Sequence, residues 1–161
     1  MIRRDSANGN DAMHQSDDAM AMLTADHRQV RARFRQYADT PNPYLKQIIA
    51  EHVFAELTLH MLLEETVFYP AFAEQADEEG KRLASEALQD HQQIKERMVT
   101  LQDVDEDAAF EAGFQALRAH VDQHVEDEET TMFPQARQVL AAHLEEIMVL
   151  MQERKEQILA S

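Results

Sequence analysis

Apolar side chains recur along the chain every three or four residues, in five successive stretches. Residues at this spacing line one face of a helix, and that face has to be buried against other helices. Polar residues occupy the positions between them, as expected for helices with one solvated side. The pattern therefore predicts four long helices and a fifth one at the end of the chain, over about residues 22–37, 44–68, 83–101, 110–132 and 139–158.

Short polar breaks separate the predicted helices. Pro41-Asn42-Pro43 supplies a helix stop, an N-cap and a first-turn proline in succession. Asp77-Glu78-Glu79-Gly80 and Asp103-Val104-Asp105 mark the next breaks, the latter with its last residue as the expected cap. Ser16-Asp17-Asp18 should cap the first helix, and Pro70 should kink or end the second.

These elements predict an all-α fold. Short turns join helices that run in opposite directions, which favours an antiparallel up-down-up-down four-helix bundle. The fifth helix should pack across an open side or end of this bundle. Residues 18–161 are expected to form one helical bundle domain. Residues 1–17 lack the apolar core of a signal peptide and are expected to be a disordered tail.

The charge and composition of the chain argue against several classes of partner. The net charge is −16, with 31 acidic and 15 basic residues, so nucleic acid and anionic membranes should be repelled. No apolar run approaches the roughly 20 residues of a membrane span. Cys is absent, which removes disulfides and thiolate metal sites and fits a cytoplasmic location. The scarcity of Gly (3) and Pro (4) agrees with long helices.

The chain contains an internal repeat at a constant offset of 64 residues. Residues 60–70 read His-x-x-x-Glu-Glu-Thr-x-x-aromatic-Pro, and residues 124–134 repeat that pattern. Upstream, Asp26-His27 corresponds in the same way to Asp90-His91. The repeat indicates a duplicated helix pair, in which each half supplies one lone His and one His-x-x-x-Glu.

The His-x-x-x-Glu spacing indicates metal binding. Residues four apart lie on the same face of a helix, roughly 6 Å apart along its axis. Imidazole and carboxylate together suit transition metals such as iron, manganese or zinc. A lone His on an apolar face is more often a hydrogen-bonded core residue, and Glu is common on helix surfaces. Two copies in register with two further His residues are hard to explain in that way.

Helix geometry brings the candidates together. Counted from the predicted turns, the four His of the repeat can sit at one level of the bundle interior. Each Glu follows its His onto the buried face, where a carboxylate without a cation is costly. We therefore interpret six residues as metal ligands: His27, His60, Glu64, His91, His124 and Glu128.

For other polar residues near these positions, the sequence allows more than one role. Glu65 and Glu129 either support the ligands or belong to the solvated surface. His120 lies one turn before His124, where the first half has Glu56. It could be an extra ligand, but it breaks the repeat, so we expect it beside the ligands or along a channel. Three His residues have no repeat partner and should be solvated: His14, His52 and His143.

The number of donors favours two metal ions. Four imidazoles and two carboxylates give roughly six donors, which would saturate a single ion. If each carboxylate bridges two ions, the same residues and a bridging oxide fill roughly ten of twelve octahedral positions. The remaining positions could then bind a diatomic molecule or peroxide.

The order H…HxxxE…H…HxxxE, with a second Glu and an aromatic-Pro pair after each HxxxE, resembles the hemerythrin-like (HHE cation-binding) family over about residues 18–137. The resemblance implies a four-helix bundle around a non-haem di-iron centre. It also implies that the six residues above ligate two iron ions, oxo- or hydroxo-bridged, with Glu64 and Glu128 bridging.

One position departs from the oxygen-carrying members of that family. They have a fifth His one turn along the third helix, where this chain has Lys95. Lys95 should lie on the side of the helix that faces the metals, and a cation cannot ligate them. One metal would then keep an exchangeable position or take a substitute ligand such as His120. The pattern is closer to the bacterial hemerythrin-like proteins with four site His.

The resemblance implies a function in small-molecule chemistry. It points to a di-iron protein that binds O₂, NO or peroxide, in binding, sensing or detoxification. Turnover of peroxide or NO would make it an enzyme, and the sequence leaves that question open. The alternative is an iron store, or a di-iron protein for repair of iron–sulfur clusters. No protein partner is indicated.

Overall fold

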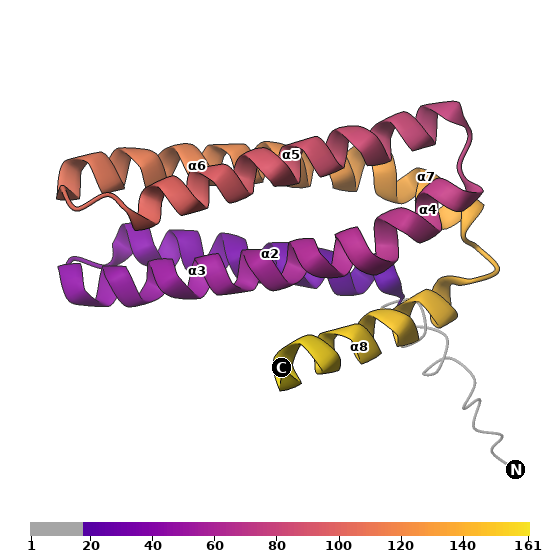
Figure 1. Ribbon diagram of the computed structural model, residues 1–161, viewed down its shortest axis with the longest axis horizontal. Coiled ribbons are helices and arrows are strands. Elements are labelled where there is room, and N and C mark those ends of the chain that lie inside the picture. Colours follow the sequence, from indigo (N-terminus) through magenta and orange to yellow (C-terminus); the bar gives the residue numbers. More distant parts are fainter. Residues whose placement is uncertain (1–17) are drawn as a thin grey trace, which may run out of the picture.

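Two helical hairpins form the body of the structure, a computed structural model that describes residues 18–161 (Figure 1). The first hairpin consists of α2 (Ala19–Asp39) and α3 (Pro43–Leu63), and the second of α5 (Glu78–Gln102) and α6 (Asp107–Asp127). They lie side by side with their turns at the same end. The predicted all-α bundle is confirmed, with α8 (Leu144–Ala160) as the fifth helix. The predicted tail and His14 lie outside the described residues.

Acidic and amide side chains begin the long helices. Asp18 accepts a hydrogen bond from the backbone N–H of Ala21, and Asn42 caps α3, as predicted. The other two long helices, α5 and α6, begin at residues that differ from the prediction. Asp77 caps α5, so the helix already includes Glu78-Glu79-Gly80. Glu106, rather than Asp105, caps α6, because its carboxylate reaches the N–H three residues on.

Each HxxxE motif runs into a π-helical turn, which the sequence analysis did not predict. These turns are η1 (Glu64–Phe68) and η2 (Glu128–Met132), and they continue into α4 (Tyr69–Gln75) and α7 (Phe133–Val139). The helix therefore passes through Pro70 instead of ending there. Proline lacks an N–H, and the wider π spacing just before it accommodates the interrupted ladder.

The apolar core is split into two clusters by a layer of polar side chains. One cluster fills the end of the bundle near the hairpin turns and includes Phe34, Phe114 and Leu117. The other fills the opposite end, with Phe68 and Phe72 from the first repeat. The six predicted ligands belong to neither cluster, and they are nevertheless buried. Both cores therefore exclude water from the layer between them.

The fifth helix packs on one hairpin only. It contacts α2, α3 and η1, and its Ile147 and Met151 are buried in the second core cluster. The repeat explains this choice. Residues 59, 62 and 63 are all Leu in α3, whereas the equivalent positions in α6 are Gln123, Glu126 and Asp127, which are exposed. Within residues 18–161, every helix is too short or too polar to cross a lipid bilayer.

Met151→Ala should lower the free energy of unfolding by about 2–5 kcal/mol, because it removes a fully buried side chain and leaves a cavity. The neighbouring Leu150 is 47% exposed, so Leu150→Ala should change the free energy by less than about 0.5 kcal/mol. Urea denaturation of both variants followed by circular dichroism measures the difference. Equal losses would contradict the docking of α8 through Met151.

Candidate metal centre

The structure brings all six predicted ligands into one buried layer. His27 comes from α2, His60 from α3, His91 from α5 and His124 from α6. Glu64 and Glu128 are the first residues of the two π turns. None of the six is more than 5% exposed. Four long helices and both π turns thus converge on a single site.

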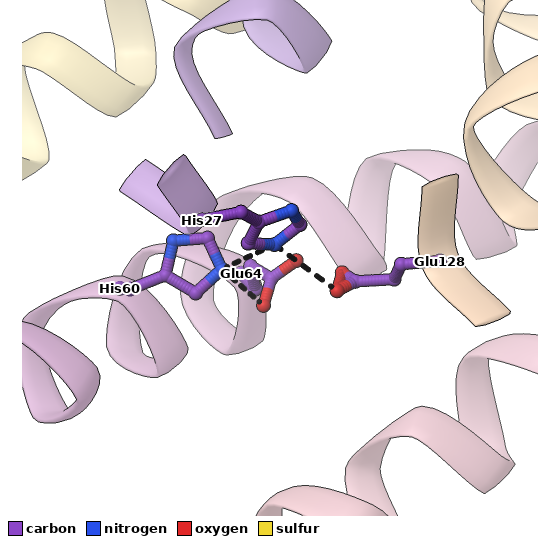
Figure 2. Close-up of side chains that lie close together, drawn as sticks. All are labelled: His27, His60, Glu64 and Glu128. Atoms are coloured by element: carbon purple, nitrogen blue, oxygen red, sulfur yellow. Dashed lines mark hydrogen bonds and ion pairs between the residues drawn. The ribbon is translucent and has the colours of Figure 1, made fainter. Parts of the chain in front are cut away.

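The first group of donors consists of His27, His60, Glu64 and Glu128 (Figure 2). The Nε2 atoms of His27 and His60 lie 3.1 Å apart. Glu64 Oε1 lies 3.0 Å from Nε2 of His60, and Glu128 Oε2 lies 3.6 Å from Nε2 of His27. One ligand atom from each residue lies within 4.8 Å of all the others, so one ion can contact all four.

The second group consists of Glu64, His91 and His124. The two imidazole Nε2 atoms are 3.2 Å apart, and Glu64 Oε1 lies 3.2 Å from that of His91. Glu128 Oε2 is 3.1 Å from Nε2 of His124. Glu64 therefore belongs to both groups, and Glu128 contacts one imidazole of each.

Three carboxylate oxygens at the point of convergence have no hydrogen-bond partner. Both oxygens of Glu64 and Oε2 of Glu128 are buried and have no hydrogen-bond partner, although imidazole nitrogens lie close by. Leaving such oxygens unpaired in the interior is costly. A cation at the point of convergence would satisfy them, so the residues present fit a bound metal.

A carboxylate stands behind each of the four imidazoles. His60 Nδ1 lies 3.0 Å from Asp26, and His124 Nδ1 lies 3.3 Å from Asp90. In the other pair, Glu129 is 3.3 Å from Nδ1 of His27 and Glu65 is 3.8 Å from Nδ1 of His91. Such partners hold the tautomer whose Nε2 lone pair faces the metal. These contacts assign Glu65 and Glu129 to support of the ligands.

Lys95 does not face the centre, contrary to the sequence-based expectation. Its Nζ lies 2.6 Å from Glu65 Oε1, on the outer side of His91, and the side chain is 42% exposed. His120 is also turned away from the metal position. Its Nε2 lies 3.5 Å from Asp90, and its Nδ1 accepts a hydrogen bond from Arg97. Neither residue replaces the fifth His of the oxygen carriers.

Tyr69 is the site residue that the sequence analysis missed. Its hydroxyl donates to Glu128 Oε1 over 3.0 Å, and it lies 3.1 Å and 3.4 Å from Nε2 of His91 and His124. The repeat equivalent is Phe133, which stacks on His27 at a centroid distance of 5.8 Å. The two halves of the centre therefore differ by one phenol oxygen, which lies beside the second group of donors.

The π turn explains why the sequence pattern did not place Tyr69 in the site. In a regular α-helix, a residue five positions after Glu64 would point about 140° away from it. The Tyr69 N–H instead bonds to the Glu64 carbonyl, five residues back, so the turn absorbs one extra residue. The angle falls to about 40°, and Tyr69 points into the site. The proline after each aromatic residue was the available sign of this irregularity.

Comparisons with known proteins agree with this geometry. The Hemerythrin HHE cation binding domain family matches residues 18–136. The chain belongs to this hemerythrin family. It is 29% identical over 123 residues to an uncharacterised hemerythrin-like protein of Schizosaccharomyces pombe, covering 75% of this chain and 58% of that protein. The chain thus spans little more than half the length of that relative.

A solved structure shares the fold. It is a hemerythrin HHE cation-binding domain-containing protein from Mycobacterium kansasii, an Rv2633c homologue. The TM-score is 0.74 at 24% identity, over 87% of this chain and 86% of that one. At that identity the likeness concerns the fold alone. The hemerythrin-like domain described here therefore carries a buried His/Glu cluster able to hold metal.

The electrostatics of the cluster couple protons to metal. Burial opposes the charged imidazole, but the Glu64 carboxylate and the Asp26 hydrogen bond raise the pKa of His60 well above its usual value. Burial likewise opposes protonation of His124, yet Asp90 and Glu128 raise its pKa to about 10. Burial would raise the pKa of Glu64, and the His60 charge holds it well below the usual range. Without metal, protons on the imidazoles neutralise the buried carboxylates.

Glu64→Gln should weaken metal binding, because Glu64 is shared by both groups of donors. Removing a residue that only supports a metal ligand commonly lowers metal affinity by about 10- to 100-fold. Removing the Glu64 carboxylate itself should lower the affinity at least as much. Glu126→Gln, an exposed carboxylate on the same helix as His124, is the control and should leave affinity unchanged. Titration with Co²⁺ measures both. Equal weakening by the two variants would refute the assignment.

Metal binding should release protons at pH 8, because the raised imidazole pKa values keep protons on the metal-free site. A raised folded pKa contributes stability that is complete below the unfolded value of about 6.5 and is lost as pH rises. The metal-free protein should therefore lose stability between pH 7 and pH 10, where His124 titrates. Calorimetry in buffers of different ionisation enthalpy counts the protons, and denaturation at both pH values tests stability. Binding without proton release would contradict this electrostatic coupling.

Proposed function

We propose that this hemerythrin-like chain is a non-haem di-iron protein that binds O₂, NO or peroxide. The observation that supports the proposal most is the sharing of Glu64 between two pairs of imidazoles. Two imidazole pairs with carboxylates between them provide for two ions better than for one. Glu64 and Glu128 would bridge the ions, and His27 with His60 and His91 with His124 would hold one ion each.

The donor set supports iron as the metal. It combines imidazole, carboxylate and a phenol oxygen without any thiolate, and such intermediate donors suit iron and its neighbours among the transition metals. A bound di-iron pair supplies reversible redox chemistry toward small oxygen and nitrogen species. The protein's own contribution is to fix the donors, through the carboxylates on each Nδ1, and to exclude bulk water.

The surroundings of the centre support a small ligand. The side chains of all six predicted ligands are buried. Phe133 stacks on His27, beside the first group of donors. Phe68 packs edge-on against Phe133 at 5.6 Å and extends this apolar cover. Beside the second group of donors, Tyr69 places a hydroxyl near His91 and His124. Burial and the adjacent Glu64 charge raise the pKa of Tyr69 well above its usual value, so the metal-free phenol keeps its proton.

The proposal predicts that the chain binds two iron ions and that the reduced protein reacts with O₂, NO or peroxide. The chain is loaded anaerobically with Fe²⁺, assayed for iron and mixed separately with each reagent. Reversible spectral change would support binding, and repeated peroxide or NO consumption would support an enzyme. A saturating ratio of one iron would refute the dinuclear proposal. Two irons without any reaction would favour iron storage or iron–sulfur repair.

The same experiment on Tyr69→Phe tests the role of the phenol. The variant reproduces in the first repeat the Phe that the second repeat already carries at residue 133. It should retain two irons, because all six predicted ligands remain. Its spectrum or its reaction with peroxide should change, because the only described hydroxyl that reaches the second group of donors is lost. Tyr37→Phe, in the distant core cluster, is the control.

A further inference from the structure

The burial of the centre raises the question of how metal ions reach it. Among the six predicted ligands, His60 and His124 retain the largest exposure, 5% each. They are equivalent in the repeat, so an ion could arrive beside either of them. The side chains that surround His60 differ from those that surround His124.

A cavity of about 300 Å³ lies beside His60, between α2, α3 and α8. Its walls include Asp26, Glu56, Leu59 and Lys155 as well as the imidazole itself. A water molecule occupies about 30 Å³ in the liquid, so this space accommodates a cation with several waters. His60, one of the six predicted metal ligands, lies in the wall of the cavity.

The wall of the cavity is suited to a hydrated cation. Glu56 uses Oε1 to accept hydrogen bonds from Arg33 over 3.0 Å and Gln29 over 3.4 Å. Its other oxygen, Oε2, has no hydrogen-bond partner and lies beneath the protein surface, where it adds negative charge beside the cavity. Asp26 adds a second carboxylate, directly on His60. Carboxylate oxygens are good ligands for divalent cations in passage, and the net charge of −16 attracts cations from a distance.

The second half of the repeat provides an internal comparison. His120 takes the place of Glu56, and its imidazole contacts Asp90 on one side and Arg97 on the other. The His120 side chain is 15% exposed and that of Glu56 is 25% exposed, so this position is more covered in the second half. Gln123 replaces Leu59 on the side that α8 does not cover. The cavity described above thus lies beside the predicted ligand of the first half.

We propose that the cavity between α2, α3 and α8 is the entrance through which divalent metal ions reach the centre. The carboxylates of Glu56 and Asp26 attract the ion, and movement of the His60 imidazole passes it inward. This inference rests on the metal centre of the proposed function, but it does not depend on iron or on the reaction with small ligands.

Leu59→Trp narrows the cavity and tests the entrance. It should slow Co²⁺ uptake by the metal-free chain, and Co²⁺ removal by a chelator, by about tenfold each. The affinity and the number of ions should stay the same, because a barrier in a passage changes both rates equally. Gln123→Trp, at the equivalent position of the second half, is the matched control and should change neither rate. Stopped-flow absorbance measures both directions.

Charge variants supply a second test that does not depend on the folding of Leu59→Trp. Glu56→Gln should slow uptake, and Lys155→Glu should accelerate it, with His120→Gln as the control for the former. Unchanged uptake in Glu56→Gln and Lys155→Glu, or equal slowing in Leu59→Trp and Gln123→Trp, would overturn the entrance. If the unmodified chain binds no Co²⁺, the metal centre fails instead, so the two failures are distinguishable.

Discussion

The structure depends on two carboxylates that are buried between two apolar cores. Glu64 and Glu128 lie in a layer where water cannot solvate their charge, so positive charge has to be supplied by the protein or by a metal. Four imidazoles surround them, and a further carboxylate supports each imidazole on its outer nitrogen. In the metal-free protein, imidazole protons provide the compensation. A metal would replace those protons, which links binding to pH and to folding stability.

The duplicated sequence produces a centre that is nearly symmetric in its ligands and asymmetric around them. The imidazoles, the carboxylates and their outer partners all follow the offset of 64 residues. Three differences break this symmetry: a phenol faces one side and a phenyl ring the other, Glu56 is matched by His120, and α8 covers only the first hairpin. A duplicated scaffold thus gives the two groups of donors different surroundings while their His and Glu residues stay the same.

Sequence periodicity predicted the helices and the buried His/Glu cluster because both obey α-helical spacing. His60 and Glu64 share a face at any point of a regular helix, so their joint burial required only the four-residue interval. The four His reached one level because the turns are short and the hairpins are nearly equal in length. Tyr69 and Lys95 were misjudged for the opposite reason. Tyr69 follows a π turn, and Lys95 has a long, flexible side chain that pairs with Glu65.

The π turns connect the folding of the chain to the chemistry of the centre. Each begins at a ligand Glu and ends just before an aromatic-proline pair, so the same irregularity recurs in both repeats. A regular helix would hold the Glu side chain equally well, but it would turn the following aromatic residue away from the site. The extra residue directs Tyr69 toward His91 and His124, and places Phe133 on His27. Interrupting the regular hydrogen-bond ladder therefore gives each group of donors a distinct aromatic neighbour, which four helices of ideal geometry could not supply from the same sequence.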